Sequence, residues 1–285
     1  MEKVLFGDNQ FFAVNHASDE KSRAQSIKFR KNEAIIQVLD DARSCGINTF
    51  MCTTHSRIAE ITNHIRMNKS EYENFKIYPC MPYAHKYANA VTELGFTGAL
   101  KEFVPGNVFS LAAKGGLAFV KQDYSKIMEI LIDAEMKMFN GIITPVIFLQ
   151  NVLVDLLLGL NMESVFLDFE NYVRDKYNAE PGYITMNMPK LVDSLDHLGI
   201  KNPIVCFSLN KLGFRVSGSI NNYEKYLLQK EFRAIAMQVL AAGALNPDEA
   251  VEYVSKFKSV KSVLFGASTK SNIRQTTDLI NKYII

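Results

Sequence analysis

Polar side chains that suit acid–base chemistry follow three apolar runs of the chain closely. Asp8 follows KVLF, His55 follows NTFMC and Tyr83 follows KIYPCM. A carboxylate or an imidazole can exchange protons near neutral pH, and a phenol can donate one. We therefore predict Asp8, His55 and Tyr83 as catalytic residues. The alternatives are a turn at Asp8, because Gly-Asp-Asn is also turn chemistry, and a hydrogen-bonded loop residue at His55.

Carboxamide side chains form a second group at such positions. They make many hydrogen bonds but do not titrate, so they suit the binding of a polyhydroxylated or amide-bearing ligand. The predicted substrate-binding residues are Asn9, Gln150, Asn151, Asn187, Asn210 and Gln238.

A metal site is the other chemistry that His55, His85 and Asp8 could serve. No two of them have the close spacing of paired metal ligands, and no third anchor is evident. The four cysteines are scattered without a C-x-x-C spacing. No metal site is predicted.

The stretch SVLFGASTKSNIRQTTDLI, residues 262–280, joins a strand-like run to a helix start. The first turn of a helix presents unpaired backbone N–H groups, which attract anions. The residues predicted to bind a phosphate or a cofactor here and in the preceding unit are Gly243, Ser268, Lys270, Ser271 and Arg274. Alternatively, Lys270 and Arg274 are exposed residues on one helix face, and Gly243 belongs to a helix-start turn.

Eight apolar runs alternate with helical patterns and would position these residues. The runs are nearly continuously apolar, as in parallel strands that are buried on both faces. They span 3–6, 48–52, 76–81, 142–149, 182–188, 203–209, 234–241 and 262–266. Eight βα units in 285 residues predict an α/β fold, a single (β/α)8 TIM-barrel domain over residues 1–285, with its chemistry at the C-terminal ends of the strands. A doubly wound sheet is the alternative, but its Gly-rich first turn is absent.

Helical periodicity is clear at 32–46, 124–139 and 247–257. The intervals 84–141 and 151–177 are too long for simple connections. We therefore expect extra helices in the third and fourth βα units, with the fourth broken near 159–161. The first loop, 8–31, is also long, and it is either a lid or a peripheral helix on the barrel rim.

The composition is that of an ordinary globular protein, with 48% hydrophobic residues and a formal charge of +2. The chain has no basic tract interleaved with aromatic residues, so nothing in its sequence indicates binding to nucleic acid. The most apolar stretch, PVIFLQNVLVDLLLGL, is too short to span a bilayer, and the N-terminus lacks the apolar segment of a signal peptide. We expect a cytoplasmic protein that binds a phosphorylated small-molecule substrate, and neither nucleic acid nor a membrane.

The end of the chain, FRAIAMQVLAAGALNPDEAVEYVSKFKSVKSVLFGASTKSNIRQTTDLI, resembles the seventh and eighth βα units of aldo-keto reductases, above all the bacterial branch. GDNQF (7–11) and NEAIIQVLDDARSCGINTFMCTTHS (32–56) are similar to the first strand of that family and the helix–strand unit that follows it. The resemblance implies a (β/α)8 barrel. It also implies that the segment with Lys270 and Arg274 matches the one that binds the 2′-phosphate region of NADPH.

The catalytic tetrad of that family is missing here. Met51 stands at the position of the family's Asp, Met81 at that of its Lys and Gln150 at that of its His, while His55 and Ser56 stand near the position of its Tyr. Met51, Met81 and Gln150 do not titrate. Carbonyl reduction by the usual route therefore lacks its proton donor.

Three functions are compatible with these residues. We favour an enzyme that acts on a phosphorylated or nucleotide-bearing, polyhydroxylated small molecule with a non-standard acid/base set, its reaction class open between lyase or isomerase type and reductase. The second is an NAD(P)H-dependent oxidoreductase with a rearranged tetrad, in which Tyr83 or His55 donates the proton and NADPH is the cofactor. The third is a non-catalytic ligand-binding or scaffold barrel, since the titrating residues of the family are lost.

Overall fold

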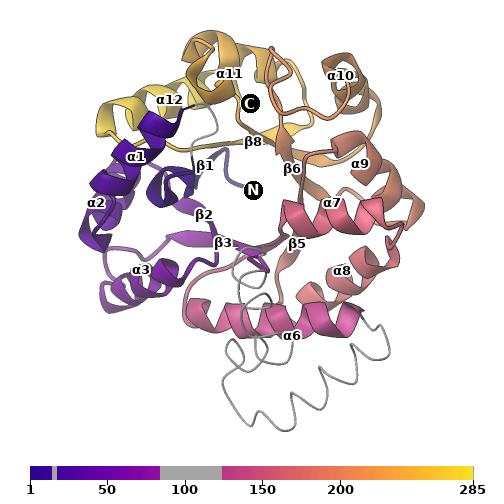
Figure 1. The fold of residues 1–285 in the computed structure, drawn as a ribbon, viewed down its shortest axis with the longest axis horizontal. Coiled ribbons are helices and arrows are strands. Elements are labelled where there is room, and N and C mark those ends of the chain that lie inside the picture. Colours follow the sequence, from indigo (N-terminus) through magenta and orange to yellow (C-terminus); the bar gives the residue numbers. More distant parts are fainter. Residues whose placement is uncertain (15–17, 84–123, 285) are drawn as a thin grey trace, which may run out of the picture.

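Eight parallel strands close into a barrel in the computed structural model of the chain, which describes residues 1–14, 18–83 and 124–284 (Figure 1). Each strand pairs in parallel with the next, and β8 pairs with β1. The strands are β1 (Val4–Gly7), β2 (Thr49–Thr53), β3 (Lys76–Met81), β4 (Val146–Leu149), β5 (Glu180–Thr185), β6 (Ile204–Ser208), β7 (Arg233–Met237) and β8 (Val260–Phe265). The predicted TIM barrel is confirmed.

Every predicted apolar run overlaps a strand, but four strands are shorter than their runs. β6 (Ile204–Ser208) lacks one residue at each end of its run. β4 begins only at Val146. β5 ends at Thr185 because Asn187 already caps the next helix. β7 ends at Met237 because Gln238 has a φ of 57°, which is outside the extended region. Apolar composition alone does not reveal these ends, since Ile142, Met186 and Val239 beyond them are also apolar.

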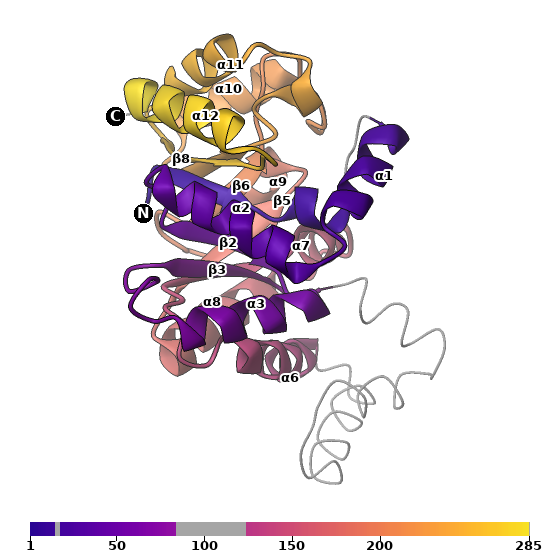
Figure 2. The ribbon, with the colours of Figure 1, turned by 90° about the vertical axis from the view of Figure 1, so that its left-hand side faces the viewer.

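Helices surround the barrel and cover the outer faces of the strands (Figures 1 and 2). The α-helices are α1 (Asp19–Lys28), α2 (Asn32–Ser44), α3 (Ser56–Met67), α6 (Tyr124–Met136), α7 (Asn151–Gly159), α8 (Ser164–Tyr177), α9 (Met188–His197), α10 (Ile220–Gln229), α11 (Pro247–Ser255) and α12 (Lys270–Tyr283). Short 3-10 helices are η1 (Asn9–Phe12), η2 (Lys137–Phe139) and η3 (Ala241–Gly243). Within the described ranges, no helix is long and apolar enough to cross a membrane.

The extra helices fall partly where they were expected. The fourth βα unit has two, α7 and α8, and the chain turns between them at Asn161, which has a φ of 54°. The third unit contains α6, and residues 84–123 of that unit lie outside the described residues. The first unit also has two helices, because the long loop 8–31 contains α1, which has no buried residue.

Side chains pack in two layers, one inside the barrel and one between the strands and the helices. Along each strand, alternate residues point inward and outward. The inner layer consists of Leu5, Met51, Tyr78, Cys80, Val146, Phe148, Ile184, Ile204, Cys206 and Ile235. Gly182 belongs to this packing, because a Cβ added there would lie 2.4 Å from Cε1 of Phe148. The interior is filled, so a ligand would bind at the mouth of the barrel.

Candidate active site at the mouth of the barrel

Asp8 follows β1 and bonds to the end of the neighbouring strand. The β1–β2 register pairs Gly7 with Met51, which brings Asp8 level with the last residues of β2. Oδ2 of Asp8 accepts hydrogen bonds from the backbone N of Thr53 at 2.8 Å and from its Oγ1 at 2.7 Å. Burial raises the pKa of Asp8, and the bonds from Thr53 oppose that rise. A carboxylate with increased proton affinity suits the role of a general base.

His55 is the N-cap of α3, and its ring is held in place from two directions. Nδ1 accepts a hydrogen bond from the backbone N of Arg57 at 3.2 Å, so the proton of the neutral ring is on Nε2. The ring stacks on Phe12, with centroids 4.2 Å apart and planes inclined by 16°. Burial, and then the charge of Arg57, lower the pKa of His55. The imidazole is therefore neutral near pH 7, and Nε2 can donate a hydrogen bond.

Tyr83 follows β3 and completes the group. Its ring centroid lies 6.1 Å from that of His55. Burial, and then the negative charge of Asp8, raise the pKa of Tyr83, so the phenol keeps its proton. The ends of three neighbouring strands thus bring Asp8, His55 and Tyr83 to one side of the mouth. His85 lies outside the described residues.

Glu135 is an acidic residue beside this group, and sequence reasoning missed it. It lies on α6, is 1% exposed, and accepts hydrogen bonds from the hydroxyl of Thr54 and from the backbone N of Tyr83 at 3.1 and 3.2 Å. Helical residues directly precede it. The strand-end rule, which selects polar residues just after predicted strands, therefore did not find it. The available signal was an acidic side chain on the apolar face of a helix, next to the buried Met136 and three residues after the buried Ile132.

Two of the predicted binding amides join the ends of β6 and β7. Asn210 is fully buried, its Nδ2 donates to the backbone O of Phe214 at 2.9 Å and of Gln238 at 3.3 Å, and its Oδ1 accepts from the backbone N of Phe214 at 2.8 Å. Oε1 of Gln238 accepts from Oγ of Ser208 at 2.7 Å. These bonds place both residues at the mouth, but the Asn210 amide is occupied by the protein itself.

The other amides lie at the starts of separate elements around the rim. Asn9 is exposed at the start of η1, and Gln150 is a buried residue in the N-cap position of α7, directly before Asn151. Asn187 caps α9, with its Oδ1 accepting from the backbone N of Lys190 at 3.5 Å. Their binding roles stay predictions.

The predicted anion site lies at the turn before α12. Thr269 is the N-cap, and its Oγ1 accepts from the backbone N of Asn272 at 3.4 Å. Lys270, Ser271 and Arg274 are exposed, while Ser268 is partly buried. Gly243 lies in the preceding βα loop, in η3, with a φ of 93°.

Two residues of the first loop also reach this turn, and sequence reasoning missed both. Lys28, at the end of α1, donates from Nζ to the backbone O of Ser268. The Gln10 amide packs on Gly266, where a Cβ would lie 2.0 Å from Oε1. Figure 2 shows α1 standing at the end of the barrel toward which β1 runs. The long first loop therefore brings a further cation to the turn. Sequence spacing could not reveal this contact, because Lys28 and Ser268 are 240 residues apart.

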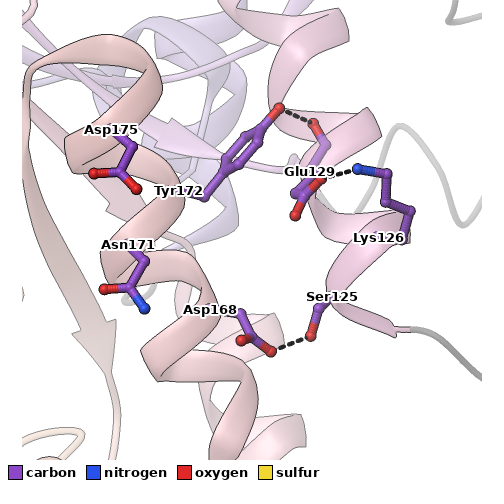
Figure 3. Close-up of a pocket in the computed structure, with 7 residues that line it drawn as sticks. All are labelled: Ser125, Lys126, Glu129, Asp168, Asn171, Tyr172 and Asp175. Carbon is purple, nitrogen blue, oxygen red and sulfur yellow. Dashed lines mark hydrogen bonds and ion pairs between the residues drawn. The ribbon is translucent and has the colours of Figure 1, made fainter.

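A separate pocket of about 480 Å³ lies between α6 and α8, in the outer helical layer (Figure 3). It is lined by Ser125, Lys126, Glu129, Asp168, Asn171, Tyr172 and Asp175. Lys126 forms an ion pair with Glu129, and the hydroxyl of Ser125 donates to Asp168 at 2.5 Å. Among the described residues, no three His, Cys, Asp or Glu side chains are grouped so as to hold a metal ion.

No protein-family model and no curated protein matches this sequence. Solved structures share its fold at low identity. A provisionally named aldo-keto reductase of Pseudomonas aeruginosa is 10% identical with a TM-score of 0.56, over 98% of this chain and 90% of that one. An aldo/keto reductase from Brucella melitensis is 10% identical with a TM-score of 0.51, over 99% and 90%. The chain therefore has an aldo-keto reductase-like barrel, and likeness at this identity shows the fold alone.

Proposed function

We propose that the protein is an enzyme that binds a phosphorylated or nucleotide-bearing, polyhydroxylated small molecule at the mouth of the barrel and moves protons on it. The observation that carries the proposal is the grouping of Asp8, His55 and Tyr83 at the ends of β1, β2 and β3. The surroundings of each side chain shift its pKa in a direction that suits one role in proton transfer. Such separation of titrating groups by their surroundings is typical of acid–base sites.

The roles follow from the pKa directions. Asp8 is the general base, because burial raises its proton affinity while the bonds from Thr53 keep the carboxylate in place. His55 is neutral and donates from Nε2 to a substrate oxygen on which negative charge develops. Tyr83 is a second donor, because its phenol stays protonated. General acid–base catalysis of this kind contributes about 10²–10⁴-fold in rate.

The phosphate end of the ligand would lie at the start of α12. Backbone N–H groups of a first helical turn favour an anion. Lys28, Lys270 and Arg274 add positive charge, and none of the three forms an ion pair with a carboxylate elsewhere in the described part of the chain. The bond from Lys28 to the backbone O of Ser268 places a third positive charge beside the two on α12, which supports an anion at this turn.

The reductase alternative has less support from the same geometry. The 2′-phosphate of NADPH would fit Lys270 and Arg274, and a bound NADPH would supply a hydride. The groups that would support the matching proton transfer are absent, because Met51 and Met81 stand at the positions of the family's Asp and Lys and neither side chain titrates. Met81 is fully buried, and Met51 packs inside the barrel.

Binding titrations test the phosphate end. Calorimetry with inorganic phosphate, phosphorylated sugars and NADPH should show at least one phosphorylated ligand that Arg274→Ala binds about one to two orders of magnitude more weakly, because a hydrogen bond to a charged group is worth about 1.5–3 kcal/mol. Lys282→Ala is the matched control, since it removes one positive charge at the other end of the same helix and should leave affinity unchanged. Equal affinity of Arg274→Ala and the parent for every phosphorylated ligand would contradict the phosphate site.

A further inference from the structure

The carboxylate of Glu135 joins two of the loops that form the proposed site. One donor is the hydroxyl of Thr54, which directly precedes His55, and the other is the backbone N of Tyr83 at 3.1 and 3.2 Å from the two carboxylate oxygens. Thr54 is fully buried and Glu135 is 1% exposed. A side chain from the helical layer thus bonds to the ends of both β2 and β3.

The strands themselves do not fix these two ends. The β2–β3 ladder runs from Thr49, paired with Lys76, to Thr53, paired with Cys80. Thr54 and Tyr83 both lie beyond its last pair. Past that point, the bonds to Glu135 connect one loop to the other.

Two other carboxylates at the mouth show what is distinctive about Glu135. Asp8 receives both of its bonds from one residue, Thr53. Asp155 on α7 accepts from Oγ1 of Thr185 at 2.5 Å and from the backbone N of Met186 at 3.0 Å, two neighbours at the end of β5. Each of these holds a single strand end, whereas Glu135 connects two.

Burying a carboxylate costs free energy, because it loses its hydration. An apolar side chain of similar volume would pack as well without that cost. What it offers is directional hydrogen bonding to two fixed points. Here those points carry the imidazole of His55 and the phenol of Tyr83, whose ring centroids are 6.1 Å apart.

We propose that Glu135 is a positioning residue that sets the spacing and orientation of His55 relative to Tyr83. The proposal rests on the proposed function, in which both side chains donate to the substrate. Glu135 acts through the two loops and does not itself contact the ligand.

Nuclear magnetic resonance of the full chain with isotope-labelled histidine and tyrosine tests this without a ligand. The His55 ring signals, assigned with His55→Gln, report its contacts with Phe12 and Tyr83. Glu135→Gln keeps the shape of the side chain but removes the carboxylate, and Thr54→Val removes one donor without changing size. In both variants we expect the His55 ring signals to shift and the contact with Tyr83 to weaken or disappear.

Asp155→Asn is the matched control, since it alters a comparable carboxylate at the end of β5. It should lower thermal stability and leave the His55 signals in place. If Glu135→Gln and Thr54→Val lower stability while the His55 and Tyr83 signals stay as in the parent, Glu135 is a structural link only and the proposal is wrong. Should Glu135→Gln not fold, the Thr54→Val spectrum decides the question. If the ring contact is lost in Glu135→Gln, but His55→Gln still catalyses hydrogen exchange on phosphorylated sugars as fast as the parent, the proposed function is contradicted instead.

Discussion

Substituting Thr53 by Val tests the hydrogen bond on which the Asp8 environment depends. Val has nearly the same shape, so the change removes the Oγ1 donor that lies 2.7 Å from Oδ2 of Asp8 and keeps the backbone donor at 2.8 Å. A hydrogen bond to a charged group is worth about 1.5–3 kcal/mol. A loss of about 2 kcal/mol would lower the melting temperature by roughly 4–8 °C for a protein of this size.

Thr49→Val on the same strand is the control. The hydroxyl of Thr49 is fully buried and has no hydrogen-bond partner in the described part of the chain. Its removal relieves a buried unpaired polar group, so this variant should be neutral or more stable by about 1 kcal/mol. Urea unfolding of the two variants compares the same chemical change on one strand, once with and once without a carboxylate partner.

The pH dependence gives a second readout. Burial holds the pKa of Asp8 above its ordinary value of 3.8, so ionisation of Asp8 costs stability as pH rises through the pKa of the folded state. Thr53→Val removes a bond that opposes this rise, and the pKa should rise further. The stability difference from the parent should therefore be largest at neutral pH and should shrink as the pH falls toward 3.8. Equal losses in both variants, or a difference that does not change with pH, would refute the reasoning.

Three further predictions concern the barrel, the helical layer and the reaction. Gly182→Ala should cost about 1–3 kcal/mol in urea unfolding, because the new Cβ would lie 2.4 Å from the Phe148 ring; Gly7→Ala, whose Cβ would meet Leu264 at 3.4 Å, should differ from the parent by much less. Burial opposes ionisation of Asp133, but hydrogen bonds from Lys176, Tyr172 and Tyr177 outweigh it and hold its pKa below 3.8. Asp133→Asn should therefore destabilise the protein at neutral pH, and its difference from the parent should narrow as pH falls below 3.8; a constant difference would contradict this assignment. NADPH-dependent reduction of simple aldehydes should be undetectable or very slow in a spectrophotometric assay, and robust turnover would contradict the assigned roles.

The strands were predictable from the sequence because each is a buried apolar run between helical patterns. Their ends were less so. At Gln238 a left-handed residue stops β7 inside an apolar stretch, and composition does not reveal backbone conformation. At Asn187, by contrast, an amide that caps a helix is a recognisable signal that the strand has ended.

The site was predictable as far as the strand-end rule reaches. Asp8, His55 and Tyr83 lie where that rule places them, because parallel strands end on one face of the barrel. Glu135 and Lys28 were missed because they lie on helices. Each contacts a residue after a strand, Thr54 or Ser268, that is distant from it in the sequence. Asn210 shows the opposite limit, since its position at the mouth was expected but its amide is used within the protein.

Proton exchange on a substrate panel tests the central claim most directly. Phosphorylated aldoses and ketoses are incubated with the protein in deuterated water, and loss of their carbon-bound hydrogen signals is followed by nuclear magnetic resonance. The account predicts exchange on at least one of these compounds, reduced by about 10²–10⁴-fold in Asp8→Asn and in His55→Gln, with phosphate affinity retained. Exchange that persists in both variants, or a panel that neither binds nor moves the His55 signals, would contradict it.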